Sequence, residues 1–144
     1  YVSDNKMIAV SDKNIMVFDG SQKPKLKQKI KLEKQIDSVF YNNKYIGVAY
    51  SNNDKKCTSH IKLYDFNGKM LMENDTSIAY RNIEFDSNNE VCVTGETACE
   101  IYTIHGVKKF YHTFDQKLYK VMYKSGINNY IFIYEGAMDE VRLK

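Results

Sequence analysis

Residues 15–20 of this 144-residue chain read Ile15-Met16-Val17-Phe18-Asp19-Gly20, an apolar stretch that runs into an Asp-Gly turn. Side chains alternate between the two faces of a β-strand, and glycine supplies the positive φ that a tight hairpin turn requires. The apolar-x-apolar pattern returns further along the chain, at Ile61-Lys62-Leu63, Ile101-Tyr102-Thr103 and Val141-Arg142-Leu143. The four copies begin at residues 15, 61, 101 and 141, so the sequence repeats with a period of about 40 residues.

A second apolar series precedes each copy with the same period. It comprises Ile8-Ala9-Val10, Ile46-Gly47-Val48, Val91-Cys92-Val93 and Ile131-Phe132-Ile133. Two more strands are expected after each turn, at 25–32 and 36–41, at 69–73 and 80–85, and at 108–114 and 118–123. Four strands in a unit of about 40 to 50 residues are the signature of a β-propeller blade.

The sequence therefore predicts an all-β, propeller-like fold with about three and a half four-stranded antiparallel blades. The units run roughly over residues 1–41, 42–85, 86–123 and 124–144 of a single domain, and the chain opens at the end of an inner strand near residues 1–2. No window shows the apolar spacing of an amphipathic helix. Within the strand at 61–63, Ile61 and Leu63 are expected to be buried, with Lys62 on the opposite side, where substitution should be nearly silent.

Composition places the chain among globular proteins, with 43% hydrophobic and 27% charged residues. The longest uninterrupted apolar run, 130–134, is far shorter than the roughly 20 residues of a membrane-spanning helix. No membrane-spanning segment is therefore expected within the chain. Because residue 1 is tyrosine and not methionine, we expect the chain to be a piece of a longer protein, in which a targeting or anchoring segment would lie outside these residues.

Lysines alternate along the strand expected at 25–32, although the net charge of the whole chain is only +3. In a regular strand this spacing would put all of them on one face. They favour an outer edge strand kept soluble by lysine, and the alternative is a patch for a polyanion or a membrane surface. Nucleic acid is an unlikely partner, because no aromatic residues for base stacking are interleaved. The candidate basic strand comprises Lys23, Lys25, Lys27, Lys29 and Lys31.

One connection between strands is longer than its equivalents. Residues 51–59 join the second and third strands of a unit, where other units use about four residues. Insertions in repeat proteins gather on one face, which is often the binding face, although a neutral insertion costs little. The candidate binding loop comprises Asn52, Asn53, Asp54, Lys55, Lys56 and Cys57.

Catalytic and metal-binding motifs are absent from the sequence, so no catalytic residue, metal or cofactor is predicted. His60, His105 and His112 show no HExxH spacing and no pairing with cysteine. Cys92 and Cys99 are close enough along the chain to meet across one hairpin, as a disulfide or as free thiols.

The pattern of apolar-x-apolar-aromatic-Asp before a turn, at 15–20 and 61–65, resembles the end of a WD-repeat or quinoprotein-like blade. The Lys-, Asn- and Tyr-rich style is similar to an uncharacterised propeller family, a domain of unknown function, from low-GC Gram-positive bacteria. That resemblance implies a membrane-anchored parent and a location outside the cytoplasm. The chain has no Gly-His repeat start and no tryptophan in place of Phe18 or Tyr64, so WD-repeat partners and the quinone cofactor are not implied.

The function expected from this fold is a non-catalytic platform that binds or scaffolds an unidentified protein or surface ligand. The alternative is a quinoprotein-like oxidoreductase or a hydrolase whose active residues lie in blades outside this chain. An arc of three to four blades exposes sheet faces that neighbours normally cover. We therefore expect a homodimer or further blades of the parent chain to cover them.

Overall fold

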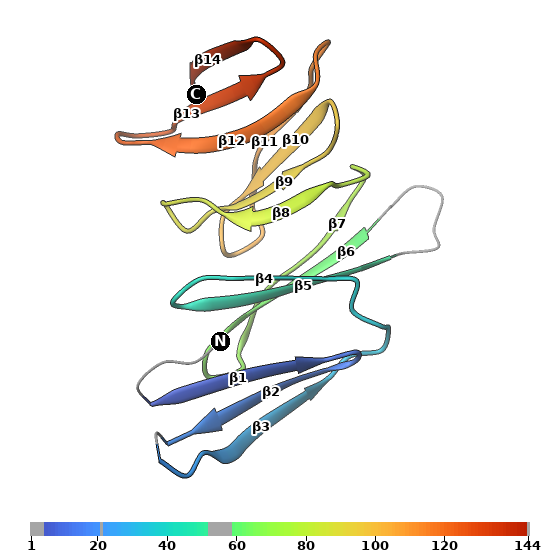
Figure 1. The fold of residues 1–144 in the computed structure, drawn as a ribbon, viewed down its shortest axis with the longest axis vertical. Coiled ribbons are helices and arrows are strands. Elements are labelled where there is room, and N and C mark those ends of the chain that lie inside the picture. Colours follow the sequence, from blue (N-terminus) through green and yellow to red (C-terminus); the bar gives the residue numbers. More distant parts are fainter. Residues whose placement is uncertain (1–4, 21, 52–58, 144) are drawn as a thin grey trace.

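The structure, a computed structural model, describes residues 5–20, 22–51 and 59–143, and every regular element in them is a β-strand (Figure 1). The all-β prediction is thus confirmed. The strands form antiparallel sheets of three or four strands, as expected for about three and a half blades. The inner strand expected near residues 1–2 lies outside the described residues. The described residues contain no helix that is long and apolar enough to cross a membrane.

The sheets follow one another in chain order. The first sheet contains β1 (Lys6–Ser11), β2 (Asn14–Asp19) and β3 (Lys25–Lys31). The second contains β4 (Ser38–Tyr41), β5 (Tyr45–Ser51), β6 (Ser59–Asp65) and β7 (Met70–Thr76). The third contains β8 (Asn82–Phe85), β9 (Val91–Thr94), β10 (Ala98–Tyr102) and β11 (Lys108–Thr113). The fourth contains β12 (Leu118–Lys124), β13 (Asn129–Tyr134) and β14 (Ala137–Arg142).

The repeat of the sequence and the sheets of the structure are offset by one strand. The last strand of the sequence unit 1–41 is β4, and it pairs with β5 of the following unit. Likewise β8 pairs with β9, and β12 pairs with β13. The segments that join β3 to β4, β7 to β8 and β11 to β12 therefore run from the outer strand of one sheet to the inner strand of the next. They tie neighbouring sheets together.

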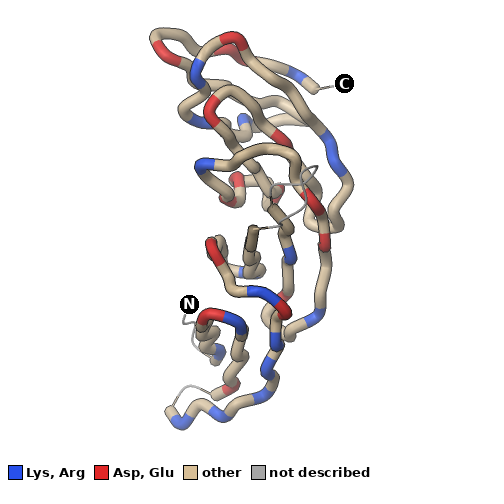
Figure 2. Tube along the Cα trace, turned by 90° about the vertical axis from the view of Figure 1, so that its right-hand side faces the viewer, with Lys and Arg blue, Asp and Glu red and all other residues tan. Residues whose placement is uncertain are grey.

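The four sheets stack face to face into a bent column (Figures 1 and 2). Three apolar clusters fill the spaces between consecutive sheets. Ile8, Ile15 and Val48 lie between the first and second sheets, Leu63 and Val93 between the second and third, and Ile101 and Phe132 between the third and fourth. The core is therefore divided into three layers, and each layer belongs to two sheets.

Both faces of a central sheet are buried in this arrangement. Val48 and Ala49 are neighbours on β5 whose side chains point to opposite faces, and neither is exposed to solvent. On β6, Ile61 and Leu63 are buried as predicted, toward the third sheet. Lys62 faces the first sheet and not open solvent, and its side chain is only 17% exposed. Substitution of Lys62 is therefore no longer expected to be nearly silent.

Gly47 on β5 shows how closely the inner strands pack. Phe40 lies directly opposite it on β4, and a Cβ atom at residue 47 would fall 2.0 Å from the Phe40 ring. Glycine leaves the space that the aromatic ring fills. Glycine at residue 47 of β5 is thus required by Phe40, its neighbour on the inner strand β4.

A β-bulge interrupts the pairing of β2 with β3 and corrects the prediction for the basic strand. Val17 pairs with Gln28 and Phe18 pairs with Leu26, so Lys27 is the extra residue. Lys29 then lies opposite Met16, and Lys25 lies opposite Asp19, three positions further along β2. Cross-strand partners share a face, so Lys25 and Lys29 point to opposite faces. The lysines flank both sides of an exposed outer strand.

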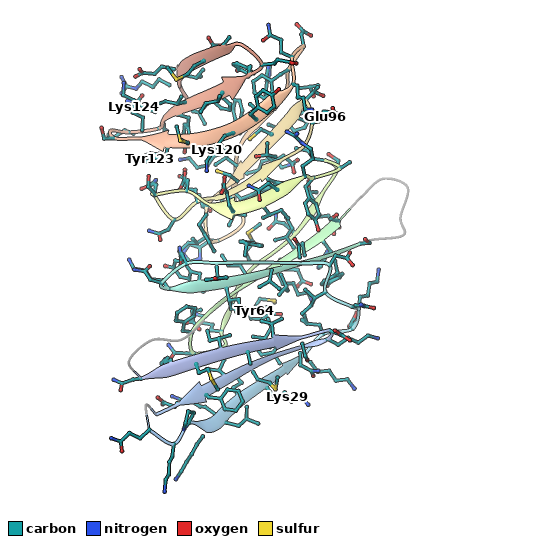
Figure 3. All side chains as sticks on the ribbon, viewed as in Figure 1. Lys29, Tyr64, Glu96, Lys120, Tyr123 and Lys124 are labelled. Atoms are coloured by element: carbon teal, nitrogen blue, oxygen red, sulfur yellow. The ribbon has the colours of Figure 1, made fainter. Side chains whose placement is uncertain are left out.

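The two ends of the stack present sheet faces that no described residue covers. On the first sheet this face carries Met7, Met16 and Phe18, which are all half-buried. On the fourth sheet it carries Met122, Ile131 and Ile133, with Met138, which is 66% exposed. Figure 3 shows Lys29 and Lys124 at these opposite ends of the column.

Replacement of Ile61 by alanine is expected to lower the free energy of unfolding by about 2–5 kcal/mol, because it opens a cavity in the layer between the second and third sheets. Lys62→Ala should cost about 1 kcal/mol, because it removes the Lys62–Glu73 ion pair at 3.1 Å while leaving the apolar layers intact. Urea denaturation measures both. Equal losses for the two variants would contradict this assignment of faces.

The 144-residue chain is expected to self-associate at micromolar concentration through its open sheet faces, because exposed apolar faces favour association. Light scattering should give a mass above that of the 16.8 kDa monomer, and Met138→Arg should shift it toward the monomer. A stable monomer for the unaltered chain would show that these faces need no cover.

Candidate functional site

A polar cleft of about 250 Å³ lies between the first and second sheets. Its floor is the β6–β7 ladder, in which His60 pairs with Asp75 and Lys62 pairs with Glu73. Tyr50 of β5 joins them from the neighbouring strand, and its ring lies 5.1 Å from the His60 ring. Glu33 and Lys34 form the wall on the side of the first sheet.

The charges in this cleft neutralise one another. His60 Nδ1 contacts Asp75 Oδ1, and His60 Nε2 lies 3.0 Å from Glu73 Oε1. Lys62 Nζ lies 3.1 Å from the same Glu73 oxygen. The hydrogen bond to His60, followed by that to Lys62, lowers the pKa of Glu73, so this carboxyl stays ionised. Both nitrogens of His60 are engaged by carboxylates, and no ring nitrogen is left to act as a base or a metal ligand.

The candidate binding loop joins β5 to β6, two strands that contribute residues to this cleft. Residues 52–57 lie outside the described residues, so their binding role stays a prediction. β5 ends at Ser51 and β6 begins at Ser59, which places both ends of the loop next to Tyr50 and His60. The candidate basic strand lies elsewhere, on the outer edge of the first sheet. There Lys27 Nζ lies 3.4 Å from Asp19, and a binding role for these lysines also stays a prediction.

The three histidines do not converge. His60 lies in the polar cleft, His105 in the turn between β10 and β11, and His112 on β11. Within the described ranges no group of three or more His, Cys, Asp and Glu side chains is placed to hold a metal ion. Cys92 and Cys99 are buried free thiols, and burial raises the pKa of Cys99 to about 12. Thiols held in the protonated form are poor nucleophiles.

A buried ionic network spans the third and fourth sheets. Lys109, the extra residue of the β10–β11 bulge, donates to Glu90, and the Tyr130 hydroxyl donates to the same carboxylate. Lys109 Nζ also donates to Asn128 Oδ1 at 2.9 Å. Asp86 lies beside Glu90 and has one buried carboxylate oxygen, Oδ2, without a hydrogen-bond partner. Burial, with Glu90 nearby, raises the pKa of Asp86 to about 6.

An aromatic groove of about 560 Å³, larger than the polar cleft, lies between β11 of the third sheet and the fourth sheet. Phe110, His112 and Phe114 form one wall, and Phe132 and Tyr134 of β13 form its floor. The rings touch in a continuous cluster, with centroids 5.5 Å apart for Phe114–Phe132 and 5.3 Å for Phe114–Tyr134. Ala137, Asp139 and Val141 of β14 form the opposite wall.

Sequence reasoning did not select this groove, although a signal was present. Phe110, His112 and Phe114 occupy alternate positions and therefore one face of an outer strand. The corresponding face of β7 carries Met72 and Thr76, which are buried against the third sheet. Aromatic rings on an outer strand, followed by a sheet without a described fourth strand, mark a surface that has room for a ligand.

A model for the family described as "Family of unknown function (DUF5711)" matches residues 1–143. The chain belongs to this family. No curated protein matches the sequence.

Two solved structures share the fold. Hsv2 of Kluyvelomyces marxianus superposes on the whole chain with a TM-score of 0.66 and 10% sequence identity. BBS1N, solved in complex with ARL6DN, superposes on 96% of it with a TM-score of 0.55 and 16% identity. The chain covers 46% and 47% of these structures, which is about half of their length. Both are β-propeller proteins, so the prediction of a propeller-like fold is confirmed.

Asp86→Asn is expected to stabilise the protein at neutral pH and to flatten its pH dependence between about pH 4 and 6. The pKa of Asp86 is raised on folding, from 3.8 to about 6, so the folded state binds the proton more tightly and stability falls as pH rises through this window. Asparagine keeps the Oδ1 that accepts from the Asn88 and Glu90 amides at 2.9 Å and adds a donor beside Glu90. Thermal melts from pH 4 to 7 measure the effect, and parallel curves for the two proteins would contradict it.

Proposed function

We propose that this member of the DUF5711 family is a non-catalytic binding module that holds a partner polypeptide in the aromatic groove. The groove itself supports the proposal most directly. Its volume of about 560 Å³ lies in the range of ligand pockets, and its walls combine aromatic rings with a carboxylate, Asp139. Aromatic side chains contribute large contact areas to protein interfaces at a low cost in conformational entropy.

The fold comparison supports a binding role at the level of the architecture. BBS1N is a propeller that was solved in complex with ARL6DN, so a protein of this fold does hold a partner. The polar cleft is a weaker candidate, because its cations and carboxylates already pair with one another. Ligand binding there would have to compete with those pairs. The groove offers apolar surface without such competition.

The alternative function, that of an enzyme, would depend on active residues in blades outside this chain. A quinoprotein-like oxidoreductase or a hydrolase would need active groups that the described part of the chain does not bring together. The membrane-anchored, extracytoplasmic parent rests on the family resemblance and stays part of the proposal, as does the Gram-positive origin. For the basic strand, an outer edge remains favoured over a polyanion site, because its lysines are divided between two faces.

A tryptophan-labelled peptide tests the groove directly, because the protein contains no tryptophan. The probe copies residues 107–114, the outer strand of the third sheet, with Tyr111→Trp. Its emission is expected to shift to the blue as the indole leaves water for the groove. Ala137→Arg, which puts a charge on the groove wall, should weaken binding by at least about tenfold.

Met138→Arg is the matched control, because residue 138 is adjacent on β14 but points to the opposite face of the sheet. It should leave the affinity unchanged. A peptide that does not bind, or equal weakening by the two variants, would contradict the groove as the binding site.

A further inference from the structure

We propose that Asp86 and Glu90 form a pH-sensitive latch between the third and fourth sheets, in which one proton shared by the two carboxyl groups holds the fourth sheet in place. Loss of this proton puts two negative charges side by side and loosens the packing of β13 on the third sheet. Neither residue lines the aromatic groove, so the latch goes beyond the proposed function and does not depend on it.

The turn between β8 and β9 brings the two carboxyl groups together. Asp86 Oδ1 accepts hydrogen bonds from the amides of Asn88 and Glu90, each at 2.9 Å, which fixes the Asp86 side chain over the turn. A turn with the same hydrogen bonds begins at Asp65, but there the residue four positions further on is the exposed Lys69. In the β8–β9 turn this position holds Glu90, which is only 6% exposed. The carboxyl group of Glu90 therefore lies inside the protein, next to that of Asp86.

The second oxygen of Asp86 faces an acceptor. Asp86 Oδ2 is buried and finds no hydrogen-bond donor among the described residues, and an ionised Glu90 can only accept. A buried acceptor without a donor is costly. A proton on Asp86 Oδ2 makes this group a donor to Glu90, which satisfies both carboxyl groups. The pKa of Asp86, raised to about 6, agrees with this arrangement, because burial and the nearby charge of Glu90 both favour the protonated form.

Glu90 connects this turn to the fourth sheet. The Tyr130 hydroxyl of β13 donates to Glu90 Oε2, and Lys109 of β11 donates to Glu90 Oε1. Lys109 Nζ also donates to Asn128 Oδ1, directly before β13, at 2.9 Å. The Tyr130 side chain is completely buried and packs in the same apolar layer as Cys92. The carboxylate that shares a proton with Asp86 is thus the one that holds β13.

Without the proton, the two carboxylates share one cation. The titratable and charged groups around the pair come from five strands and are Glu84 of β8, Cys92 of β9, Lys109 of β11, Lys120 of β12 and Tyr130 of β13. On the side of the second sheet, Tyr45 of β5 contacts the neighbouring Phe85. Lys120 pairs with Glu84 at 3.8 Å, and Lys109 is the cation that touches Glu90. Two ionised carboxylates in a buried site repel each other, and the repulsion acts on the contact between Glu90 and Tyr130.

The latch is closed in acid and opens as the pH rises. Folding raises the pKa of Asp86 from 3.8 to about 6, so the closed interface binds the proton more tightly than the open one. This advantage is lost as the pH rises through the window between the two values. Between about pH 4.5 and about pH 7, the ratio of open to closed interface is expected to increase by about tenfold or more.

The two buried thiols report this opening. Cys92 and Cys99 lie in the layer between the third and fourth sheets and are 1% and 0% exposed, so a disulfide reagent such as dithiodipyridine reaches them only when the layer opens. Cys57→Ser removes the third cysteine, and Ala49→Cys adds a thiol to the layer between the second and third sheets. Mass spectrometry of peptides then gives the labelling rate at each site. Comparison with Asp86→Asn at the same pH cancels the pH dependence of the thiols themselves.

Relative to Asp86→Asn, the protein with Asp86 is expected to label at Cys92 and Cys99 about tenfold or more faster at about pH 7, and at nearly the same rate at about pH 4.5. The thiol introduced at residue 49 should show the same ratio at both pH values. Equal acceleration at all three thiols would overturn the latch, because the proton would then act on the whole fold. A ratio at Cys92 and Cys99 that does not change with pH would also overturn it.

Two further variants test the connection through β13. Asp65→Asn is the matched control, because it changes the first residue of the similar turn in the second sheet, and it should leave the labelling of Cys92 and Cys99 unchanged. Tyr130→Phe removes the hydroxyl through which Glu90 holds β13. In this background, Asp86→Asn should change the labelling rate by no more than about twofold. An Asp86→Asn effect of full size without the Tyr130 hydroxyl would contradict a latch that acts on the fourth sheet.

Discussion

Each sheet of this protein has two apolar faces, and such a sheet is stable only between two neighbours. Val91, Cys92 and Val93 are consecutive on β9, and all three are buried, which a sheet with one solvent face would not allow. Stacking of the sheets covers both faces of the second and third. Among the described residues, none covers the outer face of the first sheet or that of the fourth, and the interface beside β14 is only partly filled.

Burial of both faces also explains the position of the charged residues. Glu100 is completely buried on β10 and accepts hydrogen bonds from the Tyr102 hydroxyl at 2.8 Å and from Lys108 Nζ at 2.6 Å. A buried carboxylate is tolerated only with such partners, and its loss of hydration otherwise outweighs the attraction. Lys109 and Glu90 repeat the arrangement at the next interface. The Thr76 hydroxyl of the second sheet also donates to Glu100, and the Tyr130 hydroxyl of the fourth sheet donates to Glu90. These hydrogen bonds between sheets favour one alignment, because another alignment would leave a buried carboxylate with fewer partners.

The sequence predicted the strands well because a strand leaves a local pattern. The period of about 40 residues located every sheet, and alternation correctly assigned Ile61 and Leu63 to one buried face. The faces of the lysines on β3 could not be predicted, because the bulge at Lys27 depends on pairing with Val17 and Phe18. The ionic pairs of His60 and Lys62 with β7 depend on cross-strand register, which the residues of one strand do not encode. The groove was missed for a related reason: its walls come from β11 and β14, which do not pair with each other.

The repeated bulge links the fold to the groove. β3, β7 and β11 each carry one extra residue opposite the same step of the preceding strand, between an aliphatic residue and the aromatic residue after it. A bulge re-aims the side chains around it. On β11 the extra residue is Lys109, which pairs with Glu90 and the Tyr130 hydroxyl. The next residue, Phe110, contacts Phe132 at a centroid distance of 5.4 Å. The hydrogen bonds of Lys109 to the Tyr130 hydroxyl and to Asn128 therefore fix this strand against the fourth sheet, and the rings of Phe110, His112 and Phe114 are held in place along one wall of the groove. An aromatic wall that is already positioned loses little conformational entropy when a partner binds.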